Sequence, residues 1–325
     1  MTGQLSSSDE LAYIVSKFPN VSHAFGYGSG AFSQTSEVKD ETDKPMLDLI
    51  FIVENPVEFH EANMRLFPDH YPTLMHTIGP NGVARLQEYP AGVHYVPYVK
   101  VNRTIKYGVV SKETLLQDLN FWSYLYIAGR MQKPTASIPG YICSHVNDAQ
   151  KNNLKSAVSA ALLMLSSSTK KSSPEIKFTQ LFEQIAALSY QGDPRISFKG
   201  EDPNKIEKLV HSPGQFSRFS SLYHEPLSEL SQMGMLNVVQ PNESLKQDGF
   251  INLDSGDVST KRQLYNFLPP QFRSLENIPV EALASAFSAI VARAAWRQPM
   301  KGLLTAGLVK SAKYAAAKVT KGLLK

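Results

Sequence analysis

The chain has one cysteine, Cys143, among its 325 residues. A single cysteine excludes an internal disulfide and a cysteine-based zinc site. No apolar run approaches the roughly 18 residues that a membrane-spanning helix needs, and the N-terminus lacks the pattern of a secretory signal. Apolar residues make up 42% of the chain and charged residues 19%. This composition indicates a globular protein with a sizeable core.

Acidic residues are absent after Glu281, whereas eight lysines and arginines follow it. Because the whole chain carries only +4, the part before this basic segment is net negative. A basic tail is attracted to phosphates, on nucleic acid or on lipid headgroups. On a helix, residues 303–325 place apolar side chains on one face and lysines mostly on others, which predicts a basic amphipathic helix. Its candidate membrane-binding residues are Lys310, Lys313, Lys318 and Lys321.

Two alternatives stay open for this basic tail. It is either a solvated or packed helix without a ligand, or an RNA-binding segment. Tyr314 is its one aromatic residue, and scarce aromatics disfavour binding to single-stranded nucleic acid. We therefore expect an anionic membrane surface as the partner and no nucleic acid.

The pattern of the chain changes near residue 147. Residues 45–55 form a short apolar run that predicts a core strand, and residues 91–111 predict two further strands. A helix is expected from the Ser111 N-cap to Gly129, and another from Glu175 to Gly192. The sequence thus predicts an α+β fold with a mixed-sheet domain (1–146), a mainly helical domain (147–296) and a basic amphipathic tail (297–325).

In the segment "HAFGYGSGAFSQ", residues 23–34, three glycines and Ser29 lie between apolar stretches. A turn at Gly28, Ser29 and Gly30 presents backbone N–H groups and a hydroxyl to a phosphate. Asp48, in the next core strand, is suited to hold Mg²⁺ against that phosphate. Mg²⁺ neutralises a triphosphate and its pyrophosphate leaving group. The arrangement resembles that of the nucleotidyltransferase superfamily.

Two features depart from that superfamily's pattern. Its second carboxylate, two residues after the first, is replaced by Ile50, and the chain between Ser29 and Asp48 is long. The alternative interpretation is a glycine-rich hairpin and an unrelated Asp48 that pairs with a lysine. Asp193 in "YQGDPR" is a candidate for the missing second carboxylate.

Three basic residues are further candidates for the phosphates of a nucleotide. Lys106 lies in a predicted strand of the first domain and is suited to neutralise a phosphate as a point charge. The alternative interpretation is a lysine that keeps a sheet edge soluble. Arg130 and Lys133 follow a predicted helix end, where basic residues also occur for helix stability alone. We assign catalysis to Asp48, Ser29 and Lys106, with the metal held by Asp48 and Asp193.

Several segments in order along the chain carry a closer resemblance. They are "YGSGAFSQ", "LDLIF", "IKYGVVS", "DLNFWSYLYIAGRMQKP", "ALSYQGDPR", "EDPNKIEKLV" and "KGLLTAGLVKSAKYAAAK". Together they resemble the mitochondrial CDP-diacylglycerol synthases of the translocator assembly and maintenance family.

The resemblance implies an enzyme, with Mg²⁺ as cofactor, that converts CTP and phosphatidic acid to CDP-diacylglycerol and pyrophosphate. It also implies a nucleotidyltransferase domain, a winged-helix-like domain, and a peripheral location on the matrix side of the mitochondrial inner membrane. The product feeds cardiolipin and phosphatidylglycerol synthesis. Two rivals remain: a nucleotidyltransferase acting on RNA or a small molecule, and an inactive membrane assembly factor.

Overall fold

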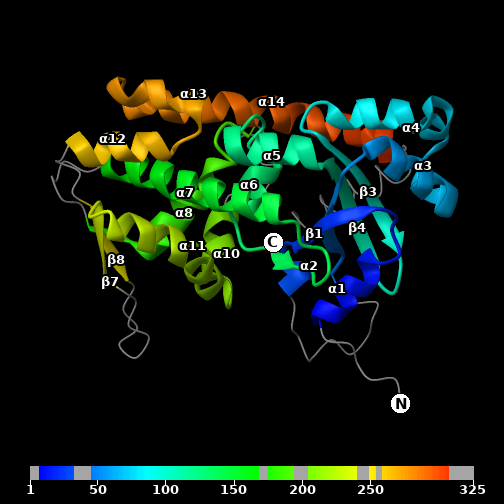
Figure 1. The fold of residues 1–325 in the computed structure, drawn as a ribbon, viewed down its shortest axis with the longest axis horizontal. Helices are drawn as coiled ribbons and strands as arrows, with labels where there is room; N and C mark the ends of the chain where they lie inside the picture. The colour runs from blue at the N-terminus through cyan, green and yellow to red at the C-terminus, as the bar shows by residue number, and fades with distance from the viewer. Residues whose placement is uncertain are drawn as a thin grey trace, which may run out of the picture. The chain divides into compact units, whose positions relative to one another are not determined.

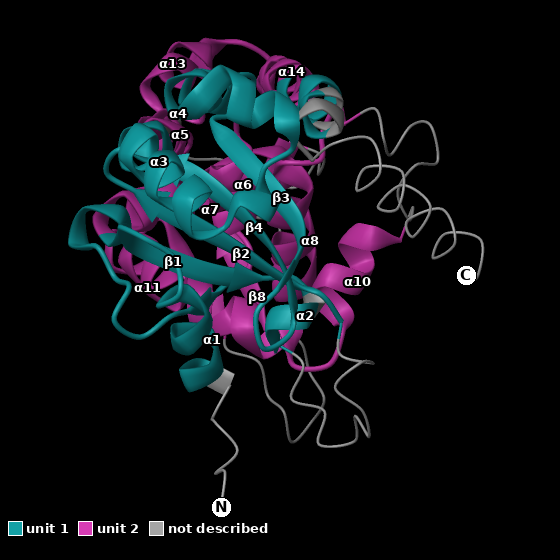
Figure 2. Ribbon diagram, turned by 90° about the vertical axis from the view of Figure 1, so that its right-hand side faces the viewer, with its two compact units in different colours: residues 1–116, 135–147, 294–325 teal, residues 117–134, 148–293 magenta. Residues whose placement is uncertain are grey.

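The computed structural model describes residues 7–32, 45–167, 175–193, 204–239, 249–253 and 258–306. Figure 1 shows the arrangement of the helices and strands, and Figure 2 distinguishes two compact units. The first unit comprises residues 1–116, 135–147 and 294–325, and the second residues 117–134 and 148–293. The domain boundaries expected at residues 146 and 296 stay predictions.

The first unit is built on a five-stranded sheet with the order β3-β4-β2-β1-β5. Strand β2 pairs in parallel with β4, whereas its pairing with β1 is antiparallel. The sheet is therefore mixed, which confirms the α+β prediction with a mixed sheet. Its strands are β1 (Val21–Tyr27), β2 (Leu47–Val53), β3 (Val93–Lys100), β4 (Thr104–Ser111) and β5 (Ala136–Ser137).

Strand β2 occupies the middle of this sheet, which explains its unbroken apolar run. Successive side chains of a strand point to opposite faces. Leu47, Leu49 and Phe51 join the main core cluster of the unit and are fully buried. Asp48 therefore faces the other side of the sheet. The expected core strand is confirmed, with its one acid on the face opposite the core cluster.

Helices connect and flank the strands of this unit. Asn55 caps α3, because its side-chain oxygen accepts hydrogen bonds from the N–H groups of Val57 and Glu58 at 3.0 and 3.4 Å, and Pro56 suits the first helical position. The helices are α1 (Ser7–Val15), α2 (Ser29–Phe32), α3 (Pro56–Leu66), α4 (Thr73–Glu88) and the start of α5 (Lys112–Phe121).

Two histidines are buried between α3, α4 and β3. His60 shares hydrogen bonds of 2.9 Å with the Tyr71 hydroxyl and the Gln87 side-chain oxygen. His94 lies against it, with ring centroids 5.1 Å apart. Burial lowers the pKa of His60 to about 4 and holds the pKa of His94 well below its usual value. Both imidazoles are therefore neutral in the folded protein near neutral pH.

We expect the protein to lose stability as the pH falls from about 6.5 to about 4. In this range the unfolded chain binds protons at these histidines and the folded chain does not, so acid favours unfolding. For His60 alone the effect is about 3 kcal/mol once the pH reaches 4. Thermal unfolding midpoints measured across this range test it. His60→Gln should flatten the pH dependence and the exposed His145→Gln should not; a midpoint independent of pH contradicts the expectation.

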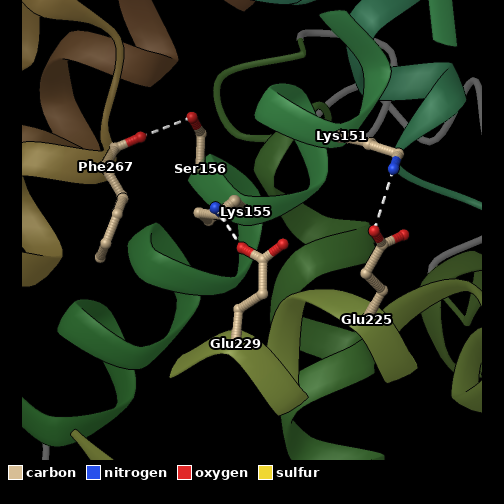
Figure 3. Close-up of polar contacts among 6 residues, drawn as sticks. All are labelled: Lys151, Lys155, Ser156, Glu225, Glu229 and Phe267. Carbon is tan, nitrogen blue, oxygen red and sulfur yellow. Dashed lines mark hydrogen bonds and ion pairs between the residues drawn. The ribbon is translucent and has the colours of Figure 1, made fainter. Parts of the chain in front are cut away.

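The second unit is mainly helical and is organised around α7. Figure 3 shows two ion pairs from α7 to α11, where Lys151 lies 3.0 Å from Glu225 and Lys155 pairs with Glu229. Ser156 donates to the carbonyl of the last residue of α12 at 2.7 Å. The helices are α6 (Ile127–Met131), α7 (Ser144–Ser167), α8 (Phe178–Leu188), α10 (Lys205–His211), α11 (Gln215–Gln232), α12 (Val258–Phe267), α13 (Pro270–Arg273) and α14 (Val280–Ala306).

The second unit also contains a three-stranded antiparallel sheet with the order β6-β8-β7. Its strands are β6 (Glu175–Lys177), β7 (Leu236–Val239) and β8 (Phe250–Leu253). The expectation of a helix from Glu175 to Gly192 is wrong at both ends, because α8 spans only Phe178–Leu188. Residues 175–177 instead form β6, which pairs with β8. A strand of three residues is too short to show a recognisable alternation of apolar and polar residues.

The helix expected from Ser111 to Gly129 is also wrong, because α5 ends at Phe121. The cause is the buried Asp118, whose carboxylate accepts hydrogen bonds of 2.7–3.1 Å from the N–H groups of residues 124–128. These five donors turn the chain back around the carboxylate before α6 begins. Trp122 and Leu125 adopt left-handed φ angles in this turn.

The described part of helix α14 ends at Ala306. Lys301 near this end is buried in the first unit and donates to the carbonyl oxygens of Gln87 and Val93 at 3.0 and 2.7 Å. The lysines predicted to bind membranes, Lys310, Lys313, Lys318 and Lys321, lie outside the described residues. None of the helices in the described part of the chain has the length and apolar character of a membrane span.

Candidate active site

Three neighbouring strands of the first unit place polar side chains in one row. Tyr27 at the end of β1 is in register with Asp48 of β2, and Asp48 is in register with Lys106 of β4. Residues paired in this way point to the same face of a sheet. The row lies on the face opposite the core cluster. The structure thus brings together Asp48 and Lys106, which the sequence indicated separately.

The Asp48 carboxylate is the centre of this row. Its Oδ1 lies 3.3 Å from the Lys106 ammonium and accepts a hydrogen bond from the Tyr27 hydroxyl at 3.4 Å. The side chain of Asp48 is 27% exposed and that of Lys106 is 16% exposed. The lysine partner anticipated by the alternative interpretation is present, but the carboxylate is still reachable from solvent. Because part of its surface is exposed, the Asp48 carboxylate can still contact a ligand although it is ion-paired with Lys106.

The ring of Tyr95 supports the lysine of this pair. The Lys106 ammonium lies 4.6 Å from the centroid of the ring, a position that favours a cation. Tyr95 is opposite Gly108 in the β3–β4 pairing. A Cβ atom on Gly108 would lie 2.6 Å from the ring, so only glycine leaves room for the tyrosine there. Tyr27 and Tyr95 were not identified from the sequence as members of the site. The one available sequence signal was Gly108, a glycine inside the otherwise continuous strand β4, opposite Tyr95.

The glycine turn lies directly beside the Asp48 carboxylate. Gly28 is exposed and has φ +74°, and a Cβ atom there would lie 3.7 Å from Asp48 Oδ2. At Gly30 a Cβ atom would lie 2.5 Å from the Met46 carbonyl oxygen, which excludes any larger residue. Both glycines therefore serve turn geometry, and Gly28 also brings bare backbone next to the carboxylate. The side chain of Ser29 lies outside the described part of the structure.

At position 50, where the nucleotidyltransferase superfamily has its second carboxylate, this chain has no metal ligand. Ile50 is fully buried, and the described residues contain no group of three or more His, Cys, Asp or Glu side chains placed to hold a metal ion. Mg²⁺ commonly binds through one or two carboxylates, with substrate phosphates and water as the other ligands. A reachable carboxylate beside the bare backbone of Gly28 fits that chemistry.

The other candidates belong to the second unit. Asp193 is buried, and its N–H donates to the Tyr190 carbonyl at 3.1 Å. Arg130 lies at the end of α6, over the ring of Tyr126 at 5.9 Å. Lys133 donates to the Ser189 hydroxyl at 2.8 Å and to a carbonyl at the end of α6. The metal role of Asp193 and the nucleotide-binding roles of Arg130 and Lys133 stay predictions.

Comparison with known proteins identifies the family. The family model described as "Phosphatidate cytidylyltransferase, mitochondrial" matches residues 11–282 and 275–321. Proteins of that name from Danio rerio and Schizosaccharomyces pombe are each 34% identical to the chain. The matches cover 95% of the chain and 93% of the Danio protein, and 93% of the chain and 80% of the yeast protein.

A nucleotidyltransferase-like protein of known structure, from Exiguobacterium sibiricum, covers 76% of the chain at 11% identity with a TM-score of 0.23, a superposition too loose to bear on function. The family and sequence matches define the chain as a nucleotidyltransferase. It belongs to the family of mitochondrial phosphatidate cytidylyltransferases.

Proposed function

We propose that the chain transfers the cytidylyl group of CTP to phosphatidic acid, giving CDP-diacylglycerol and pyrophosphate. Membership of the family supports the reaction. The observation that carries the proposal is the meeting of the Gly28 turn, Asp48 and Lys106 at one partly buried, solvent-accessible part of the sheet. An inactive relative has no need of a reachable carboxylate held between a bare backbone turn and a lysine.

The chemistry requires no protein nucleophile. A phosphate oxygen of phosphatidic acid attacks the α-phosphorus of CTP, and the bond from that phosphorus to the pyrophosphate oxygen breaks. Mg²⁺, when bound at Asp48, would neutralise the triphosphate and the leaving group. Lys106 contributes a fixed positive charge, and the N–H groups of Gly28, Ser29 and Gly30 provide donors for phosphate oxygens.

The remaining candidates complete the proposed site. Arg130 and Lys133 bind phosphates of the nucleotide, and Asp193 supplies the second carboxylate for the metal. Asp193→Asn should then weaken the dependence of activity on Mg²⁺ concentration, and an unchanged metal titration would remove Asp193 from the site.

The molecule that accepts the cytidylyl group distinguishes the proposed reaction from the alternative functions. Purified protein with CTP and Mg²⁺ should release pyrophosphate when phosphatidic acid is added, and label from [α-³²P]CTP should enter the lipid. RNA and small-molecule acceptors should release none. Pyrophosphate release with RNA in place of phosphatidic acid would contradict the proposal, and no release with any acceptor would favour the inactive assembly factor.

We also propose a winged-helix-like architecture for the second unit. Three features support it: the antiparallel β6-β8-β7 sheet, the helices α8, α10 and α11 between β6 and β7, and the short β7–β8 pairing at the end. The protein would act at the matrix face of the mitochondrial inner membrane, where its basic tail binds anionic lipid. The product would feed cardiolipin and phosphatidylglycerol synthesis.

Truncation after Ala306 is expected to abolish binding to anionic vesicles while activity on detergent-dispersed phosphatidic acid largely survives. Each lysine near an anionic surface contributes about 1 kcal/mol, so the four proposed contacts together change affinity by roughly 1,000-fold. The cut is placed after Ala306 because Lys301 is buried in the first unit and its loss would disturb the fold.

Vesicle flotation measures this binding. Replacing Lys310, Lys313, Lys318 and Lys321 together by glutamine should reproduce the loss, and replacing them by arginine should not, because arginine keeps the charge. Unaltered flotation of the truncated protein would rule out the proposed role of the tail.

A further inference from the structure

The Tyr95 ring lies beside Lys106 because of the way in which β3 and β4 pair. Tyr95 is in register with Gly108, and Lys106 is two residues before Gly108 in β4. Residues two apart in a strand share a face, and a diagonal neighbour on the partner strand is within reach of an aromatic or a long side chain. The ring centroid and the ammonium group are 4.6 Å apart, within the range of a cation–π contact.

The Tyr95 ring is held in place by its packing on β4. A Cβ atom on Gly108 would lie 2.6 Å from Cε1 of the ring and 2.9 Å from Cγ2 of Val93. Both side chains therefore pack over the bare backbone of Gly108. Val93 is fully buried and Tyr95 is half-buried. This packing restricts the ring, because a backbone atom does not move aside as the end of a side chain does.

Strand β3 is irregular directly opposite Lys106. Its register with β4 shifts between Val96 and Val99, so that Pro97 and Tyr98 together lie opposite this one lysine. Tyr98 has φ +56°, a left-handed conformation that is uncommon for a residue other than glycine. An extra residue in one strand is a β-bulge, and bulges beside active sites re-aim side chains. Backbone strain concentrates at functional sites, and here it coincides with the position that faces Lys106.

The attraction between Lys106 and Asp48 weakens when a ligand occupies the carboxylate. The ammonium group lies 3.3 Å from Asp48 Oδ1, so a cation bound to that carboxylate would neutralise its charge and repel the ammonium. The face of a tyrosine ring attracts a cation although the ring carries no net charge. A metal ion on Asp48 does not cancel this attraction. The ring can therefore hold the ammonium group while the carboxylate binds the metal.

We propose that Tyr95 is a positioning residue for cytidylyl transfer, which keeps the Lys106 ammonium group in the row while a cation and the nucleotide phosphates occupy the site. The inference rests on the proposed function, because that function assigns Lys106 to the phosphates. It gives a shared role to two irregular features of the sheet. Gly108 leaves room for the ring, and the bulge at Pro97 and Tyr98 interrupts the regular pairing opposite the lysine.

Two substitutions separate the ring of Tyr95 from the rest of its side chain. Tyr95→Leu removes the ring and should lower kcat for CDP-diacylglycerol formation by roughly 10- to 30-fold. Tyr95→Phe keeps the ring and should retain kcat to within about 2-fold. In a Lys106→Met background Tyr95→Leu should lower kcat no further, because no ammonium group is left to hold.

Three kinetic results would overturn the proposal. The first is a kcat of Tyr95→Leu equal to that of the wild type. The second is a kcat of Tyr95→Phe as low as that of Tyr95→Leu, which would assign the effect to the hydroxyl group. The third is an undiminished effect of Tyr95→Leu in the Lys106→Met background, which would show that the ring acts independently of the lysine.

The contact between ring and ammonium can also be measured without metal or substrate. Urea unfolding of the wild type, Tyr95→Leu, Lys106→Met and the double variant forms a double-mutant cycle. The effects of the two substitutions on the unfolding equilibrium constant should be coupled by roughly 2- to 5-fold. Additive effects would mean that the two groups do not stabilise one another, and the proposal would fall.

The matched control is Tyr89→Leu. Tyr89 is another tyrosine of the first unit whose ring contacts a cation, the Arg297 guanidinium at 5.6 Å, but it lies outside the row and its loss should leave kcat unchanged. If Tyr95→Leu lowers the thermal midpoint, Tyr95→Met replaces it, since methionine adapts to irregular spaces. A wild type that transfers no cytidylyl group to phosphatidic acid overturns the proposed function as well, whereas an active wild type with an unaffected Tyr95→Leu overturns this inference alone.

Discussion

Replacing Asp48 by alanine is expected to lower kcat for CDP-diacylglycerol formation by at least about 100-fold, with the protein still folded. Asp48 is the one reachable carboxylate in the row formed by β1, β2 and β4, so its loss would remove the proposed protein ligand of the metal. The fold should tolerate the change. The side chain of Asp48 is 27% exposed, and the Lys106 ammonium has a second contact, with the Tyr95 ring.

The matched control is Glu54→Ala. Glu54 follows the end of the same strand and is ion-paired with Lys112, but it lies outside the row. This variant should keep wild-type kcat. Steady-state kinetics with CTP and phosphatidic acid, together with circular dichroism of both variants, provides the measurement. Equal kcat for Asp48→Ala and the wild type would show that the carboxylate has no part in catalysis.

Replacing Asp118 by alanine is expected to be strongly destabilising, by about 3–5 kcal/mol. Five backbone N–H groups would lose their acceptor in a buried turn, and a buried donor without a partner is costly. For a unit of this size we expect the thermal midpoint to fall by roughly 10 °C. Asp118→Asn should also destabilise, because its amide nitrogen would face N–H donors instead of accepting from them.

The control for Asp118 is Asp148→Ala, which removes an exposed acid from the same unit and should leave the midpoint unchanged. Differential scanning calorimetry compares the two variants with the wild type. A midpoint for Asp118→Ala within about 1 °C of the wild type would mean that the five hydrogen bonds do not stabilise the turn.

Strands β2, β3 and β4 of the first unit could be predicted because each carries a local signal. The apolar run around Asp48 predicts a central strand, and Asn55 followed by Pro56 marks the start of the next helix. Strand pairing has no such local signal. That Lys106 lies beside Asp48 depends on the parallel register of β2 and β4, which brings together residues almost 60 positions apart.

The errors have a common physical cause, since each involves a contact that the hydrophobic pattern of the segment does not record. Asp118 looks like a polar residue on a helix surface, yet it ends the helix by accepting hydrogen bonds from residues that follow. Glu175 to Lys177 looks like the first turn of a helix, yet it pairs with β8.

The proposed reaction requires a magnesium-bound nucleotide beside Asp48. The most direct measurement is a crystal structure with Mn²⁺ in place of Mg²⁺ and a non-hydrolysable CTP analogue. An anomalous difference peak about 2.0–2.2 Å from an Asp48 carboxylate oxygen, with the triphosphate against the Gly28 turn, is the predicted result. A bound nucleotide whose metal lies away from Asp48, with the carboxylate still paired only to Lys106, would contradict it.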